Sequence, residues 1–136
     1  MLGSARSSAR MVVTRCVIVT SPRTHIGIGE FQKVGWLPIE QRVRQIGINH
    51  VFRIQHGLSA PYLQIGFTRV ADTHSHNTRA SAHGLVIPRL GSQDQKTFVY
   101  QGIKNWNTLP RHIQSMSTLV TFKSAVKKYL FISVQP

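Results

Sequence analysis

The chain has 136 residues, enough for one domain of ordinary size, and 41% are hydrophobic, which argues against wholesale disorder. Seventeen lysines and arginines face only four acidic residues, so the net charge is +13. A charge of this size indicates a polyanionic partner. Nucleic acid is the commonest such partner, although an anionic membrane surface would also attract the chain. The single cysteine excludes an internal disulfide and a cysteine-based zinc finger, and it favours an intracellular compartment, nuclear or cytoplasmic.

Residues 1–34 are expected to form a basic leader that is poorly ordered or partly helical. The first 29 residues contain no acid. Such a composition is found in mitochondrial transit peptides, but also at the basic end of a helix, and the second interpretation is preferred. The apolar stretch 11–20 is shorter than the roughly 20 residues that a bilayer requires, so no membrane span is expected. Gly27 and Gly29 predict a loop at the end of the leader.

A long helix is predicted over residues 38–57, with Gly57 as its stop. Its apolar stripe is expected at positions three or four residues apart: Ile39, Val43, Ile46, His50, Ile54 and Leu58, with Val51 and Phe52 beside them. His50 on this stripe indicates a buried histidine more readily than a metal ligand. Gly47 offers room for a close helix crossing.

A polar, basic loop without regular structure is expected over residues 68–83, after a further helical turn at 61–67. Residues 85–89 then form a short extended or β segment, because Ile87 precedes a proline. The loop gathers four potential metal ligands: Asp72, His74, His76 and His83. Such a set can ligate zinc, but a flexible loop does not fix the geometry, so a solvated loop without metal is expected.

A pair of helices joined by a rigid corner is predicted over residues 98–131. Pro110 disfavours a helical conformation at the residue before it, and it suits the first turn of a new helix. Ser117 is expected to cap the last helix. The corner should fold this last helix back so that Trp106 and Phe122 lie against each other. The expected core of the region is apolar: Trp106, Leu109, Ile113, Leu119 and Phe122.

The predicted fold is therefore mainly α. Residues 35–136 are expected to form a small helical domain with one long helix, a basic loop with a short extended segment, and a C-terminal helical pair. No polymerase, nuclease or nucleotide-hydrolysing site is expected, because the four carboxylates are scattered and no glycine-rich phosphate loop is present. No cofactor is implied.

Basic side chains are the stronger functional feature. Three are expected on the outer face of the long helix, three in the loop region and three on the last helix: Arg42, Arg44, Arg53, Arg69, Arg79, Arg89, Lys123, Lys127 and Lys128. Each can neutralise a phosphate, and together they predict salt-dependent binding of RNA or DNA with little sequence preference. The alternative is an ordinary solvated surface.

Eight short motifs follow one another in a fixed order: Ser7-Ser8-Ala9-Arg10-Met11-Val12, His25-Ile26, Gly35-Trp36-Leu37-Pro38-Ile39-Glu40-Gln41-Arg42, His56-Gly57-Leu58-Ser59-Ala60-Pro61-Tyr62-Leu63, His76-Asn77-Thr78-Arg79, Ile87-Pro88-Arg89, Trp106-Asn107-Thr108-Leu109-Pro110 and Thr118-Leu119-Val120-Thr121-Phe122-Lys123. This series resembles the C-terminal region of the reverse transcriptase polyprotein of LINE-type, non-LTR retrotransposons. The resemblance covers nearly the whole chain.

The resemblance implies a region that follows the polymerase core and helps to hold template RNA or target DNA. In that family the polymerase site lies upstream, around paired aspartates, so no catalytic residue is carried over to this chain. The expectation is a non-catalytic C-terminal remnant that binds nucleic acid. The alternative is a structural remnant, or one that docks on a reverse transcriptase core, with no activity of its own.

Overall fold

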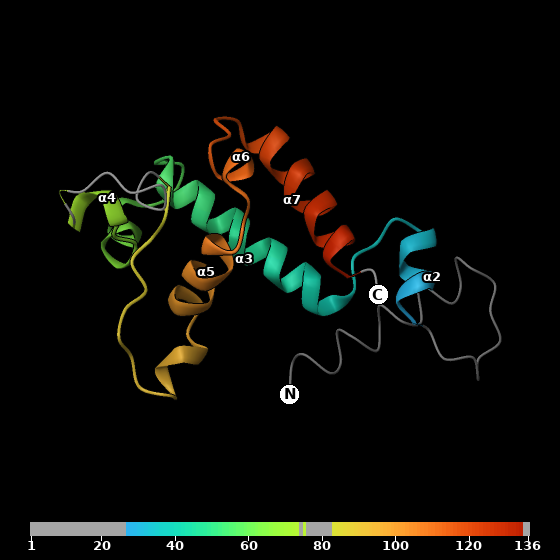
Figure 1. Ribbon diagram of the computed structural model, residues 1–136, viewed down its shortest axis with the longest axis horizontal. Coiled ribbons are helices and arrows are strands. Elements are labelled where there is room, and N and C mark those ends of the chain that lie inside the picture. Colours follow the sequence, from blue (N-terminus) through green and yellow to red (C-terminus); the bar gives the residue numbers. More distant parts are fainter. Residues whose placement is uncertain (1–26, 74, 76–82, 135–136) are drawn as a thin grey trace. The chain divides into compact units, whose positions relative to one another are not determined.

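The computed structural model describes residues 27–73, 75 and 83–134, and Figure 1 labels its helices. The described chain is mainly helical, which confirms the predicted fold class, and α3 (Ile39–Gln55) is the expected long helix. Contacts divide the chain into two compact units. Of the described residues, one unit consists of 27–43 together with 127–134, and the other of the described part of Arg44–Val126.

The first unit contains helix α2 (Ile28–Lys33), where Gly27 and Gly29 had predicted a loop, so that prediction was wrong. The Glu30 carboxylate accepts a hydrogen bond of 3.0 Å from the Gly27 backbone N–H, which satisfies a donor at the start of the helix. Gly35, with φ of 68°, ends the helix in a left-handed conformation that glycine tolerates. The remainder of the predicted leader, residues 1–26, lies outside the described residues. This unit buries apolar side chains from three segments: Phe31, Leu37 and Leu130.

Helix α3 buries only part of the predicted apolar stripe. Val43 and Ile46 are 63% and 44% exposed, and His50 is exposed as well, so its interpretation as a buried histidine was wrong. Val51, Phe52 and Ile54 are buried as predicted, and Gln45 and Ile48 are buried although they were not placed on the stripe. The Phe52 ring stacks on that of Phe122 with 4.2 Å between centroids, so the buried side of α3 is centred on Val51 and Phe52. The predicted stop at Gly57 is confirmed by its φ of 66°.

The middle of the chain is more ordered than predicted. The expected turn after α3 is the 3-10 helix η1 (Pro61–Gly66). The segment predicted to lack regular structure contains the short helix α4 (Val70–Thr73), so the prediction was wrong there. Arg69 and Leu85 form an isolated antiparallel bridge, which confirms a short β-like segment beside the basic loop. A second 3-10 turn, η2 (Asp94–Lys96), follows.

The C-terminal helical pair is present, with a short helix between its members. Helix α5 (Phe98–Asn107) ends before the corner, Pro110 is extended with ψ of 146°, and α6 (Arg111–Gln114) follows. The last helix, α7 (Leu119–Ser133), starts one residue later than predicted. Thr118, not Ser117, takes the cap position, because the Thr118 carbonyl accepts the first helical hydrogen bond.

The predicted core of this region is largely confirmed. Leu109 and Ile113 are buried, while Leu119 is only half-buried. Trp106 is 3% exposed, and its ring lies 5.7 Å from that of Phe122, between centroids. The predicted contact between these two aromatic side chains is therefore correct.

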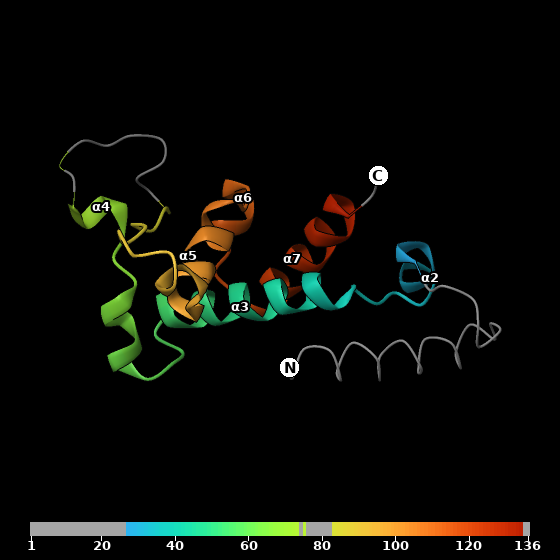
Figure 2. The same cartoon turned by 90° about the horizontal axis from the view of Figure 1, so that it is seen from below.

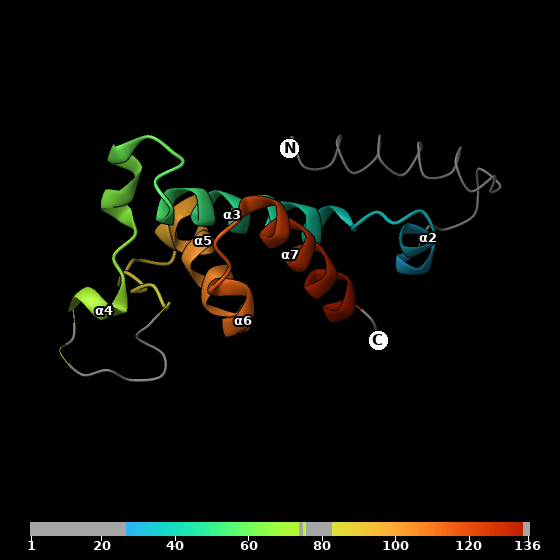
Figure 3. The ribbon, with the colours of Figure 1, turned by 90° about the horizontal axis from the view of Figure 1, so that it is seen from above.

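Helices α3 and α5 cross closely at Gly102 rather than at Gly47. A Cβ atom at Gly102 would lie 3.0 Å from Cγ2 of Val51, whereas one at Gly47 would lie 3.9 Å from the Phe98 ring. Figures 2 and 3 show α5 beside the C-terminal half of α3, and α6 follows α5 after the corner at Pro110, so this crossing also affects where α6 begins. The absence of a side chain at Gly102 is therefore a packing requirement.

We predict opposite effects of alanine at these two glycines. Gly47→Ala should raise the free energy of unfolding by up to about 1 kcal/mol, because alanine is the better helix former and meets only an ordinary contact. Gly102→Ala should lower the free energy of unfolding by about 1 kcal/mol or more, because the new methyl group forces the buried Val51 side chain to move and this β-branched side chain has few alternative rotamers. Urea unfolding of both variants measures the difference. A stabilising Gly102→Ala would contradict the close crossing.

Candidate nucleic-acid interface

The three arginines predicted to line one face of α3 do not share a face. At 100° per residue, Arg42 and Arg53 fall within about 20° of each other, while Arg44 lies on the opposite side of the helix from Arg53. Arg42 and Arg53 are exposed and Arg44 is half-buried. The long helix therefore presents basic groups in two directions.

Arg69 is held by the end of α3. Its Nε donates a hydrogen bond of 2.8 Å to the Gln55 side-chain oxygen, and its Nη2 donates one of 3.3 Å to the Gln55 backbone carbonyl. A helix leaves its last carbonyls without internal partners, so this contact caps α3. The guanidinium remains exposed on its other side.

The remaining predicted residues lie on three parts of the chain. Arg79 lies outside the described residues. Arg89 is exposed in the extended segment, and Lys123 is exposed on the part of α7 that belongs to the larger unit. Lys127 and Lys128 are exposed in the smaller unit, where the Lys127 ammonium lies 5.7 Å from the centroid of the Phe131 ring.

The segment 83–86 is bonded along both of its edges. On one edge, the Val70 N–H donates to the Gly84 carbonyl at 3.0 Å, and the Val86 N–H donates to the Thr68 carbonyl at 2.9 Å. These two bonds form the antiparallel bridge with residues 68–70. The segment thus behaves as a very short strand.

The other edge is paired with the end of α5 by the Asn107 side chain. The Leu85 N–H donates to Asn107 Oδ1 at 3.0 Å, and Asn107 Nδ2 donates to the Leu85 carbonyl at 2.9 Å. The amide therefore replaces the peptide group of a neighbouring strand. Trp106 adds a third bond, because its Nε1 donates to the His83 carbonyl at 2.9 Å. The motif Trp106-Asn107 thereby fixes residues 83–85 against α5.

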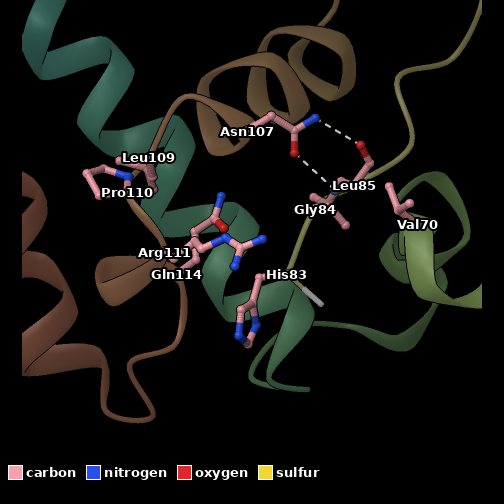
Figure 4. Close-up of a pocket in the computed structure, with 9 residues that line it drawn as sticks. All are labelled: Val70, His83, Gly84, Leu85, Asn107, Leu109, Pro110, Arg111 and Gln114. Carbon is pink, nitrogen blue, oxygen red and sulfur yellow. Dashed lines mark hydrogen bonds between the residues drawn. The ribbon is translucent and has the colours of Figure 1, made fainter. Parts of the chain in front are cut away.

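This attachment forms a pocket of about 570 Å³ between segment 83–85 and α6 (Figure 4), here called the α6 pocket. Figure 4 shows the Arg111 side chain extending from α6 into the space beside Gly84, with the His83 ring nearby. Its lining residues include no carboxylate: Val70, His83, Gly84, Leu85, Asn107, Leu109, Pro110, Arg111 and Gln114.

A second, smaller pocket of about 220 Å³ adjoins the α6 pocket and shares His83 and Gln114 with it. It adds Arg69 and His56 as basic groups, and the hydroxyls of Ser115 and Ser117. Its lining residues also include no carboxylate. The two adjoining pockets together form a groove without an acidic lining residue. Its arginines only donate hydrogen bonds, whereas its amides and hydroxyls both donate and accept.

Arg111, His56 and Gln114 were not predicted as site residues. Arg111 could have been predicted as an unpaired basic group. The sequence contains no acidic residue after Asp94, so no later carboxylate neutralises it, and its position directly after Pro110 places it at the predicted corner. Nothing in the spacing of the other two indicates that they meet at one pocket.

His74 and His76 of the predicted solvated loop lie outside the described residues, while Asp72 and His83 are described. Within the described ranges, no three histidine, cysteine or acidic side chains come together as metal ligands. None of the described helices combines the length and apolar character that a bilayer span requires. Comparison of the chain with protein-family models, curated proteins and solved structures finds no match in any of the three.

We predict that Asn107→Ala lowers the free energy of unfolding by about 2 kcal/mol, because the N–H and the carbonyl of the buried Leu85 both lose their partner. Asn105→Ala, at a neighbouring asparagine of α5, serves as the control and should change stability by about 0.5 kcal/mol or less. The amide hydrogen of Leu85 should exchange with solvent faster in Asn107→Ala than in wild type, and its exchange rate should not change in Asn105→Ala. Equal effects of the two substitutions would contradict the strand-like pairing.

Proposed function

We propose that the chain is a non-catalytic nucleic-acid-binding protein, similar to the C-terminal region of LINE-type reverse transcriptase polyproteins, that holds RNA or DNA with little sequence preference. The observation that carries the proposal is the distribution of charge. Residues 44–126 contain nine of the 17 basic residues but only two acids, Asp72 and Asp94. A nuclear or cytoplasmic location is consistent with this role.

The physical basis is the release of counterions from the phosphate backbone. Exposed arginines and lysines displace condensed cations from phosphates, so the affinity depends on salt and not on the base sequence. Arg53, Arg89 and Lys123 supply exposed basic groups from three separate segments of the larger unit. Contacts of this kind position a nucleic-acid strand without recognising its base sequence.

A catalytic role is not part of the proposal. Phosphoryl transfer with two metal ions requires carboxylates only a few ångströms apart. The four acids of this chain, Glu30, Glu40, Asp72 and Asp94, belong to four different elements. The Glu30 carboxylate in addition already accepts a hydrogen bond from the Gly27 N–H at the start of α2.

The test is a salt series of binding to mixed-sequence RNA and DNA. If six to eight phosphates are neutralised, affinity should fall by roughly three orders of magnitude between about 50 and 200 mM salt. Replacing Arg42, Arg44 and Arg53 together by alanine should lower the slope by about two to three units. The matched triple lysine variant should keep the wild-type slope, because it keeps the charges.

The alanine variant must retain its helical circular dichroism for the comparison to count. An alanine variant with the wild-type slope would mean that these arginines are an ordinary solvated surface. A strong preference for one mixed sequence over another would contradict backbone binding.

A different observation favours the alternative, docking on a reverse transcriptase core. The 3-10 helix η1 leaves Tyr62, Leu63 and Ile65 exposed by 71%, 39% and 84%. An exposed apolar cluster of this kind is typical of a protein–protein contact, and its side chains carry no charge with which to neutralise a phosphate. The occupant under this alternative is the polymerase segment that precedes such a region in the polyprotein.

We predict for this alternative that Tyr62→Ser combined with Ile65→Ser weakens binding to a purified polymerase segment by about tenfold or more, because two large apolar side chains lose their burial. Val120→Ser, at a separate side chain that is 80% exposed, is the control and should leave binding unchanged. Biolayer interferometry measures all three proteins. Equal affinities would contradict docking through η1.

A further inference from the structure

We propose that the α6 pocket receives one unpaired nucleotide of a bound single strand, with its base against the apolar wall and its phosphate on Arg111 and His83. This inference rests on the proposed nucleic-acid binding and adds a specific site to it. It also adds a modest preference for bases that carry an exocyclic amino group.

The pocket has the size and chemistry of a nucleotide site. Its volume of about 570 Å³ lies within the range of about 300–1,000 Å³ found for small-ligand pockets. Leu85 and Leu109 are buried and contribute apolar wall, on which the face of a base can lie. Arg111 is exposed at the pocket, and its planar guanidinium suits the oxygens of a phosphate.

Gln114 provides the polar group that faces the base. Its side chain lines both pockets and is only 8% exposed. Its Nε2 donates a hydrogen bond of 2.8 Å to the Trp106 carbonyl, while its Oε1 accepts none from the described part of the chain. The bond to the Trp106 carbonyl fixes the orientation of the Gln114 amide. The amide atom that stays available is therefore Oε1, which is a hydrogen-bond acceptor. This acceptor lines both pockets and is open to them, so it favours a ligand that brings a hydrogen-bond donor.

The exocyclic amino groups of adenine and cytosine are such donors and have two hydrogens each. Uracil and thymine have a carbonyl oxygen at that position and offer a single ring N–H, so the expected preference is modest. A base inside a duplex is both paired and stacked, so it must leave the helix before it can enter a pocket. The pocket therefore favours a single strand, in which extracting the base costs less because no pairing is lost. The smaller pocket, with Arg69 and His56, is the next position along the groove and suits the adjacent phosphate.

The test measures fluorescence anisotropy of the full chain with labelled octamers of dA, dC and dT and with a duplex of the same length. Arg111→Ala should weaken binding of dA and dC octamers by about tenfold, the loss expected for a charge-assisted hydrogen bond. Arg89→Ala removes an exposed arginine outside both pockets and should weaken it by only about twofold.

The amide is tested by Gln114→Leu, which keeps the volume of the side chain. Wild type should bind the dA and dC octamers about threefold or more tightly than dT, and the variant should lose that ratio. Stacking within the free strands is the same for both proteins, so the change in the ratio reports the pocket. Should this variant unfold, the Arg111 and Arg89 comparison still decides the proposal.

Three outcomes would overturn the inference while leaving the proposed function intact. Equal losses for Arg111→Ala and Arg89→Ala would mean that Arg111 acts as one more surface charge. Duplex binding as tight as that of the single strands would exclude an unpaired base. AMP binding as tight as that of the dA octamer would identify a site for free nucleotides rather than for a strand. If wild type binds no octamer at about 50 mM salt, the proposed function itself fails.

Discussion

The pairing of Asn107 with Leu85 is the contact on which the candidate site depends. One amide side chain satisfies both the N–H and the carbonyl of a buried residue that is 22 positions away in sequence. A buried peptide group without partners would cost about 1–3 kcal/mol for each missing bond. Trp106 strengthens the attachment through its indole N–H and through its ring, which packs near Phe122. The same two residues thus join the core of the larger unit to the wall of the α6 pocket.

This arrangement gives the basic residues different roles. Arg69 caps α3 through Gln55, so part of its hydrogen-bonding capacity serves the fold. Arg111 stands beside the pocket with an apolar wall behind it, so it can bind a phosphate where a base is also held. Arg53, Arg89 and Lys123 remain as exposed charges on separate segments. In the proposed function, the net charge of +13 attracts the polyanion and the α6 pocket is the proposed point of contact.

Local sequence signals predicted element boundaries correctly where one residue type determines the backbone conformation, although they missed α2 and α4. Gly57 ended α3, and Pro110 separated α5 from α6. The buried face of α3 was predicted only in part, at Val51, Phe52 and Ile54, because Ile46 and Ile48 both fit a helical stripe that includes later residues of the helix. Stacking of Phe52 on Phe122, a contact between distant segments, selects between them. The α6 pocket was missed for the same reason: Arg111, Gln114 and His83 meet only because Asn107 fixes residue 85, and spacing along the chain does not encode that.

The most direct test of this account is a backbone NMR titration of the full chain with a single-stranded dA octamer. The account predicts that the amides of residues 83–85 and of α6 shift most, that their shifts saturate together, and that those of η1 change little. Side-chain signals of Arg111 and Gln114 should follow the same curve. Shifts spread evenly over every exposed lysine and arginine, without a maximum at segment 83–85 and α6, would contradict a defined site and leave only diffuse electrostatic attraction.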